Sequence, residues 1–150
     1  MINSFKNYLN TGYVKKKTPD TEEAKALLEK AKNRIQYTKS REINDRTSQF
    51  VLEDAYEAIR ESAQALMSVK GFKPYSHEAT ISFIKEFYNS DFNEQELSKF
   101  DRFRQLRNDS VYKAKIVTKE DSKASILFAI EFINKVSFLL KSLKWNTSAF

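Results

Sequence analysis

The stretch TSQFVLEDAYEAIRESAQALMSVKG, residues 47–71, predicts a long amphipathic helix. Its apolar side chains recur at intervals of three and four, which is the period of one helix face. Thr47 is a residue type that caps helix N-termini, and Gly71 is one that ends helices, so we expect the helix to last to Val69. The expected buried face consists of Leu52, Ala55, Tyr56, Ile59, Ala63 and Leu66.

The segments on both sides of this stretch also predict helices. Asp20 and Glu23 match a capping box, and the helix that they begin is expected to run to about Ser40. Ser76 is expected to cap a shorter helix over residues 77–88. Short polar segments separate these helices, as in an antiparallel bundle.

The last third of the chain predicts two more long helices. Asn93 and Glu96 form a second capping box, and the helix after them is expected to fray or bend near residues 108–109. Thr118 and Asp121 are expected to cap the final helix. Its apolar stripe is wide enough to contact several neighbouring helices.

Composition agrees with an all-α fold. The 150 residues include two glycines and two prolines, fewer than strands joined by tight turns generally need. We therefore expect an antiparallel bundle of four long helices plus one short helix and an N-terminal helical arm, in a single domain over residues 1–150. Residues 1–17 form the arm, and its lysine run 15–17 is interpreted as a solvated linker. Residues 146–150 are expected to form a loose tail.

Charge and residue usage limit the function classes. The net charge is +6, and it divides into +5 over residues 1–46, −3 over residues 47–92 and +4 over residues 93–150. A partner that carries phosphates is one interpretation, and a solvated lysine-rich surface is the other. The chain has no cysteine, no signal-peptide apolar region and no apolar run near the ~20 residues of a membrane span. We expect a cytoplasmic protein without membrane contact.

The stretch FRQLRNDSVY, residues 103–112, concentrates hydrogen-bonding groups near the end of its predicted helix. Side chains three and four positions apart share a helix face, so Arg104, Arg107 and Asn108 cluster, and Tyr112 follows one turn later. Two guanidinium groups on one face suit a phosphate, which each can bind through two oxygens. The alternative is that Asp101, Asp109 or acids elsewhere in the bundle pair with these arginines.

This pattern resembles the signature of the HEPN domain family. The family motif is an arginine, usually followed by a polar residue, with a histidine a few positions later; here Arg107 and Asn108 match its first part. Further segments are similar to other parts of the family: NYLNTGYVKKKTPDTEEAKALLEKAKNRI, YEAIRESAQALMSVKGFKPYSHEAT and YKAKIVTKEDSKASILFAIEFI. Their order and spacing extend the resemblance over most of the chain.

The resemblance implies a dimeric helical bundle with two motif copies in a basic cleft. Many members are metal-independent endoribonucleases, and they often form the toxin half of a toxin–antitoxin pair with a small nucleotidyltransferase. Others bind nucleotides or RNA without cleaving, or serve as scaffolds. Carried over to this chain, Arg104, Arg107 and Asn108 would bind phosphates, Arg107 and Tyr112 would be catalytic, and Asp109 would support the arginine geometry.

Tyr112 stands where the family motif has its histidine. Histidine suits both proton transfers of RNA cleavage because its pKa lies near neutrality, whereas tyrosine, at about 10, is a poor base. Tyr112 can still donate a hydrogen bond to a phosphate, stack on a base, or accept a nucleotide from a partner enzyme. His77 is the only histidine in the chain, and we expect a structural role for it at the first turn of its helix.

Metal chemistry has little support in the sequence. One histidine without cysteine makes a zinc site improbable, and no Glu-x-x-His occurs for a di-iron bundle. Asp54, Glu57 and Glu61 are interpreted as a solvated acidic face. No metal or cofactor is expected. Two functions stay open: a ribonuclease-type toxin controlled by a nucleotidyltransferase antitoxin, and a non-catalytic homodimer that binds RNA or nucleotide, or acts as a scaffold.

Overall fold

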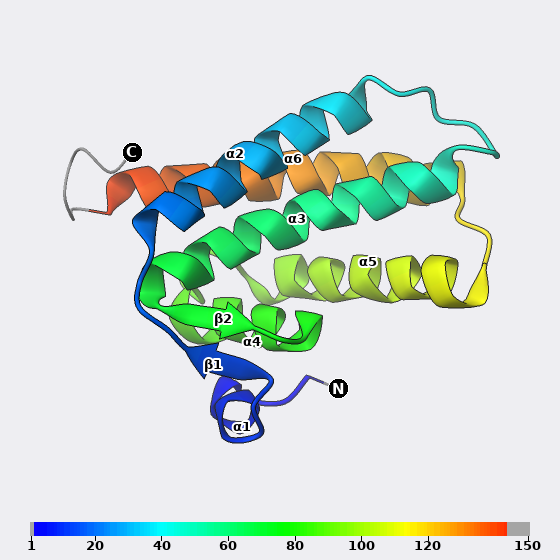
Figure 1. The fold of residues 1–150 in the computed structure, drawn as a ribbon. Helices are drawn as coiled ribbons and strands as arrows, with labels where there is room; N and C mark the ends of the chain where they lie inside the picture. The colour runs from blue at the N-terminus through cyan, green and yellow to red at the C-terminus, as the bar shows by residue number, and fades with distance from the viewer. Residues whose placement is uncertain (1, 144–150) are drawn as a thin grey trace.

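The computed structural model describes residues 2–143, which form helices and one small sheet (Figure 1). The predicted loose tail, residues 146–150, lies outside the described residues. The all-α fold class is confirmed. The elements in chain order are α1 (Phe5–Asn10), β1 (Val14–Lys16), α2 (Thr21–Lys39), α3 (Ser48–Lys70), β2 (Phe72–Pro74), α4 (His77–Phe87), α5 (Glu94–Lys113) and α6 (Lys119–Ser142).

Helix α3 is the centre of the bundle. It contacts α2, α4, α5 and α6, and α2 runs antiparallel beside it (Figure 1). Because neighbours cover it on several sides, its buried surface is wider than one amphipathic stripe, and Val51, Ala58 and Met67 join the predicted face in the core. Tyr56, at the middle of α3, has no exposed surface.

Most of the predicted helix ends are confirmed by hydrogen bonds. The side chain of Asp20 accepts from the Glu23 backbone N–H at 2.9 Å, and that of Ser76 accepts from Ala79 at 3.0 Å. Asn93 and Glu96 form both bonds of a capping box. Each bond satisfies a backbone donor that the first helical turn leaves unpaired.

Two expectations about helix ends are wrong. Thr47 does not cap α3; its hydroxyl donates to the carbonyl of Glu42 at 2.7 Å and so orders the preceding loop. Helix α5 does not bend at residues 108–109 but continues to Lys113. It ends at Ala114, whose φ of 51° is left-handed, and the carbonyl of Asp109 accepts the backbone N–H groups there.

The two-stranded sheet was not predicted. Strands β1 and β2 pair antiparallel, with Lys15 opposite Lys73, and β1 follows α1 directly (Figure 1). Three-residue strands are too short to show an alternating pattern in the sequence. The interpretation of the lysine run as a solvated linker is therefore wrong: Lys15 and Lys16 lie in a paired strand, and Lys17 bonds through its backbone to Gly71 and through its amine to Glu23.

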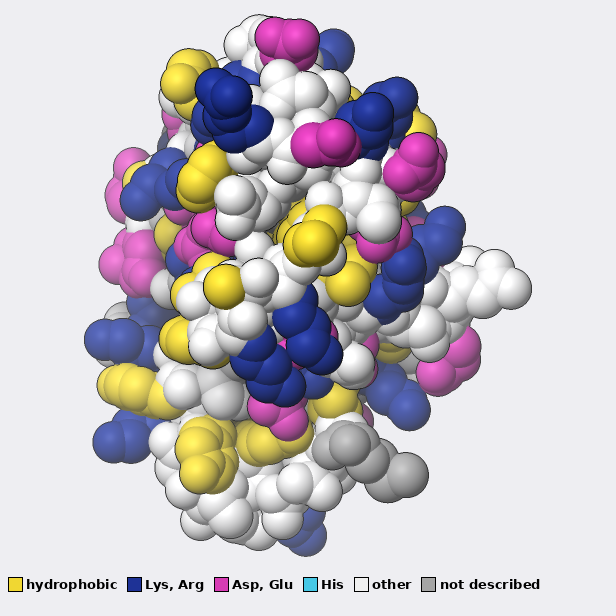
Figure 2. Space-filling model, turned by 90° about the vertical axis from the view of Figure 1, so that its right-hand side faces the viewer, with side chains coloured by type: hydrophobic (Ala, Val, Ile, Leu, Met, Phe, Trp, Pro, Cys, Tyr) yellow, Lys and Arg dark blue, Asp and Glu magenta, His cyan; other side chains and the backbone are white. Residues whose placement is uncertain are grey.

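Charged groups of both signs cover the face shown in Figure 2, with hydrophobic side chains in small groups between them. On α6, Leu127 and Phe138 are 64% and 70% exposed, although most apolar residues of this helix are buried. Within residues 2–143, no helix combines the length and apolar character that a membrane span requires. The same part of the chain contains no group of His, Asp and Glu side chains placed to hold a metal ion.

Candidate nucleic-acid site

Arg104 and Arg107 lie on the side of α5 that faces α3 and α4. The Arg104 side chain is 15% exposed; its Nε–H donates to Asp101 Oδ1 at 2.7 Å, and its Nη1 lies 3.7 Å from Glu78 Oε1. Arg107 is bound more loosely: Nη1 donates to Asn108 Oδ1 at 3.2 Å, and Nη2 lies 4.0 Å from Glu57 Oε1. Both guanidinium groups therefore have carboxylates nearby, but only that of Arg104 is hydrogen-bonded to one.

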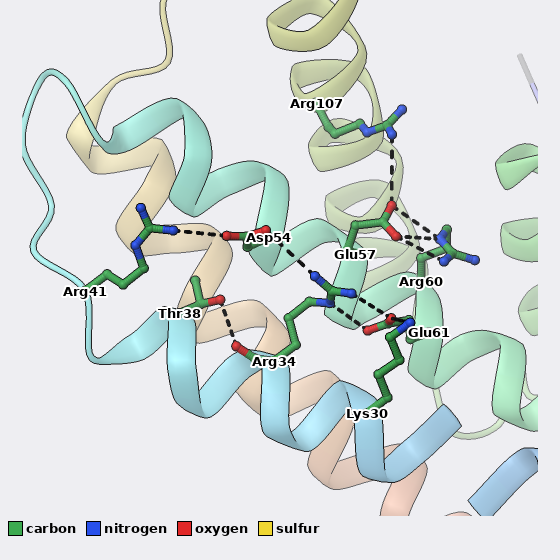
Figure 3. Close-up of polar contacts among 9 residues, drawn as sticks. All are labelled: Lys30, Arg34, Thr38, Arg41, Asp54, Glu57, Arg60, Glu61 and Arg107. Atoms are coloured by element: carbon green, nitrogen blue, oxygen red, sulfur yellow. Dashed lines mark hydrogen bonds and ion pairs between the residues drawn. The ribbon is translucent and has the colours of Figure 1, made fainter. Parts of the chain in front are cut away.

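Glu57 and Arg60 of α3 complete this charged cluster (Figure 3). Arg60 donates to Glu57 Oε2 from Nε at 3.2 Å and from Nη2 at 3.0 Å, and to Gln64 Oε1 from Nη1 at 2.8 Å. Burial disfavours the charged form of Glu57, but the bonds and positive charge of Arg60, together with Arg107, outweigh it and lower the pKa of that carboxyl. Glu57 is thus an ionised bridge between the two arginines.

His77 and Tyr56 form a hydrogen-bonded pair beside the arginines. The Tyr56 hydroxyl lies 2.9 Å from His77 Nδ1. Burial, followed by the positive charges of Arg60 and Arg107, lowers the pKa of His77 to about 4. Burial also raises the pKa of Tyr56, so the phenol keeps its proton. The imidazole is neutral at physiological pH, and it joins the first turn of α4 to the middle of α3.

Tyr112 and Asp109 lie at the outer end of the cluster. Tyr112 is 73% exposed, and the guanidinium carbon of Arg107 lies 5.7 Å from the centre of its ring, within the range of a cation–π contact. The carboxylate of Asp109 lies 3.4 Å from Lys113 Nζ and 3.9 Å from Lys115 Nζ. The structure therefore brings together Arg104, Arg107, Asn108 and Tyr112, while the described ion pairs of Asp109 are with lysines.

The predicted solvated acidic face on α3 is wrong. Glu61 is 1% exposed and accepts two bonds from Arg34 of α2, at 2.9 and 3.0 Å (Figure 3). Asp54 pairs with Arg41 of the loop after α2 at 3.3 Å and with Arg34 of α2 at 3.8 Å. No local pattern in the sequence indicates which basic residue of α2 faces each acid of α3.

Sequence reasoning also missed how close Glu57, Arg60 and His77 come to the arginines of α5. The segments are far apart in the chain, so no local pattern links them. The structural role expected for His77 stays a prediction, and its ring bonds to the Tyr56 side chain. Its first helical turn nevertheless adjoins the charged cluster, and with Arg60, Gln64 and Tyr75 it lines a hollow of about 210 Å³.

A larger hollow of about 540 Å³ lies between α1, α4 and α5. Its charged lining residues are Lys85, Glu86, Glu94 and Asp101, so acids outnumber bases there. This charge balance does not suit a phosphate ligand. The arginine cluster between α3, α4 and α5 is the better candidate site for an anion.

The fold and the charged cluster together describe an all-α bundle with an arginine pair and an adjacent polar side chain near the end of α5. A family model described as the HEPN domain matches residues 24–139 of the chain. The chain belongs to this family, which indicates a nucleotide- or RNA-related function; HEPN domains are commonly ribonucleases and often dimerise. No curated protein matches the chain.

Proposed function

We propose that this protein binds RNA or nucleotide phosphates through Arg104, Arg107 and Asn108 in the cleft of a homodimer, as the toxin-like, ribonuclease-type half of a toxin–antitoxin pair. Its partner would be a minimal nucleotidyltransferase antitoxin in a prokaryotic cytoplasm. The proposal depends mainly on one observation: the guanidinium group of Arg107 makes few polar contacts. Apart from its cation–π contact with Tyr112, the described contacts of Arg107 are one hydrogen bond to Asn108 and a long ion pair to Glu57, which leave guanidinium donors for a phosphate.

Catalysis would divide between two side chains. The neighbouring 2′-OH would attack the phosphorus and lose its proton to solvent, while the bond to the 5′-oxygen breaks and that oxygen takes a proton from solvent. Arg107 would stabilise the charge that develops on the phosphate. Tyr112 would donate a hydrogen bond to a phosphate oxygen or leaving oxygen from its exposed position next to Arg107. Asp109 would support the end of α5 through its contacts with Lys113 and Lys115. No metal or cofactor enters this scheme.

A non-catalytic RNA- or nucleotide-binding or scaffold dimer is the second candidate. It is favoured by the absence of a near-neutral base among the described site residues. The His77 pKa of about 4 makes its ring a weak base, and its Nδ1 is already bonded to Tyr56. In this alternative the arginines hold the ligand and no bond is cleaved.

An RNA cleavage assay in the presence of EDTA separates the two candidates. For a ribonuclease, we expect cleavage by the wild-type protein, a loss of about a hundredfold or more in Arg107→Ala, and a partial loss in Tyr112→Phe. For a binding module, RNA is retained but not cut, and Arg107→Ala weakens retention. Lys123→Ala, an exposed basic residue on α6, is the control. A protein that neither binds nor cuts RNA or nucleotide would contradict both.

Dimerisation and the antitoxin are tested separately. Leu127 and Phe138 lie eleven positions apart on α6, so they share one exposed face, with Glu131 and Asn134 between them, that we propose a second copy covers. Light scattering of the wild type should give twice the chain mass, and Leu127→Glu/Phe138→Glu should give the monomer. Co-expression with a nucleotidyltransferase from the neighbouring gene should relieve any growth inhibition. Mass spectrometry of Tyr112 would show whether the partner adds a nucleotide.

A further inference from the structure

The two segments that form the small sheet are strongly basic. Residues 13–17 and 70–75 contain five lysines and no acidic residue. Over the face shown in Figure 2, by contrast, basic and acidic side chains lie close together. The sheet therefore carries positive charge that its own segments do not neutralise.

The register of the sheet brings two of these lysines together. Lys15 lies directly opposite Lys73, a pairing that destabilises a sheet because like charges face each other. Neither amine lies within ion-pair distance of a carboxylate of the described residues, whereas Lys17 nearby is paired with Glu23. An anion between Lys15 and Lys73 would relieve their repulsion.

Both amines lie over one exposed aromatic ring. Tyr75 is 53% exposed, with Lys15 Nζ 5.2 Å and Lys73 Nζ 5.6 Å from its ring centre. Its backbone N–H donates to Tyr13, which is 52% exposed and follows α1. Aromatic faces flanked by positive charge are the usual platform on which proteins stack the bases of single strands.

The platform is continuous with the arginine cluster. Tyr75 lines the 210 Å³ hollow together with Arg60 and His77. Arg60 in turn bonds to Glu57, which faces Arg107 across the α3–α5 contact (Figure 3). This chain of contacts suggests the route that a ligand at Arg107 would take past Arg60 to Tyr75.

We propose that the sheet is a second RNA-binding surface, on which Tyr75 stacks a base of single-stranded RNA and Lys15 and Lys73 hold the flanking phosphates. This inference rests on the proposed function, because it extends the strand that occupies the arginine cluster. A single-stranded RNA, but not a mononucleotide, is long enough to contact both the arginine cluster and the sheet. The exposed rings of this surface are tyrosines, which can stack on bases. The aliphatic side chain of the sheet, Val14, is buried, so the surface has little apolar area that a lipid chain could contact.

The test is fluorescence anisotropy with a dinucleotide and with an oligouridylate of about twelve nucleotides, long enough to span both surfaces. For the longer probe, we expect Tyr75→Ala to lose about 5- to 150-fold in affinity and Tyr75→Phe to bind like the wild type. Lys15→Ala/Lys73→Ala should make the slope of log K against log salt less steep by about 1.4, the value for two phosphate contacts on a single strand. Dinucleotide binding should be unchanged in all three variants.

The matched control is Lys123→Ala/Lys141→Ala, which removes the same charge from exposed positions on α6. If it weakens binding of the longer probe as much as the sheet variant does, the sheet is only part of a diffuse positive field and the proposal is overturned. If the sheet variants instead lose binding to vesicles that contain phosphatidylserine while RNA binding stays intact, the ligand is a membrane and the proposal is also overturned. A wild type that binds neither probe contradicts the proposed function itself, whereas loss in Arg107→Ala alone contradicts only the sheet surface.

Discussion

Glu57 and Arg107 face each other across the contact between α3 and α5, with 4.0 Å between Oε1 and Nη2. Glu57 is also bonded to Arg60, so one carboxylate restrains two guanidinium groups of the candidate site. A phosphate that binds Arg107 must compete with this carboxylate. If Arg107 binds anions as proposed, Glu57 would lower their affinity by competing for the guanidinium group.

Replacement of Glu57 should strengthen binding. Glu57→Gln removes the competing charge and keeps the shape, and we expect the affinity for RNA to rise by roughly fivefold, about 1 kcal/mol, the range of partly exposed ion pairs. Titration calorimetry or anisotropy measures this change. Glu29→Gln, an exposed acid on α2, changes the net charge equally and should leave affinity nearly unchanged. An equal gain in both variants would show that net charge, and not the Glu57–Arg107 pair, governs affinity.

The ion pair between Arg34, which is partly exposed, and Glu61, which is buried, should be important for stability. Arg34→Met leaves the Glu61 carboxylate, which is 2% exposed, with only Lys30 at 3.5 Å as an ionic partner. We expect a loss on the order of 3 kcal/mol in the free energy of unfolding, measured by urea denaturation. Arg41→Met, which breaks the more exposed pair with Asp54, should cost less than about 1 kcal/mol.

The double variant Arg34→Met/Glu61→Met tests whether the instability of Arg34→Met comes from the unpaired, buried carboxylate of Glu61. It removes both charges at once, so we expect it to be more stable than Arg34→Met alone and near the wild type. If the double variant is as unstable as the single one, the packing of the arginine stem, rather than the unpaired carboxylate, explains the loss.

The two glycines give a matched pair of substitutions. Both have φ near 80°, but a Cβ at Gly71 would lie 2.6 Å from the carbonyl oxygen of Lys17, whereas one at Gly12 would meet nothing within 4 Å. Gly12→Ala should cost about 1 kcal/mol for the left-handed backbone. Gly71→Ala should cost more, because the segment after β1, with Lys17 and Pro19, must move away from the end of α3. Equal losses of unfolding free energy in the two variants would show that the chain around Lys17 can move away from residue 71 at little cost.

The helices could be predicted because their signals are local. Asp20, Asn93 and Thr118 act through residues three positions away, and the apolar stripes follow the helical period. The small sheet could not be predicted, since its pairing joins three-residue segments almost sixty positions apart. The helical break expected near Asn108 does not occur, and α5 continues to Lys113.

The candidate site also has a part that the sequence predicts and a part that it does not. Arg104, Arg107 and Asn108 were predicted to cluster because they share one helix, and the structure places them together. Their partners Glu57, Arg60 and His77 come from α3 and α4, and only the packing of three helices shows which carboxylate faces which arginine. Glu61 illustrates the limit most clearly: its sequence neighbours give no indication that Arg34 of α2 buries it.

The single histidine gives a pH test of the α3–α4 contact. The pKa of His77 is lowered to about 4 in the folded protein, against about 6.5 when unfolded, so the unfolded chain binds the extra proton between these values. Stability contributed by the neutral ring is fully present above about pH 6.5 and falls as the pH drops towards 4. We expect His77→Asn, whose amide oxygen can accept from Tyr56, to lose this part of the pH dependence. Urea denaturation of the wild type and of His77→Asn across pH 4–7 gives the His77 contribution as the difference between their unfolding free energies. NMR titration of the one imidazole gives its pKa directly. An imidazole that titrates near 6.5 in the folded protein would contradict the burial of the ring between Tyr56 and the arginines.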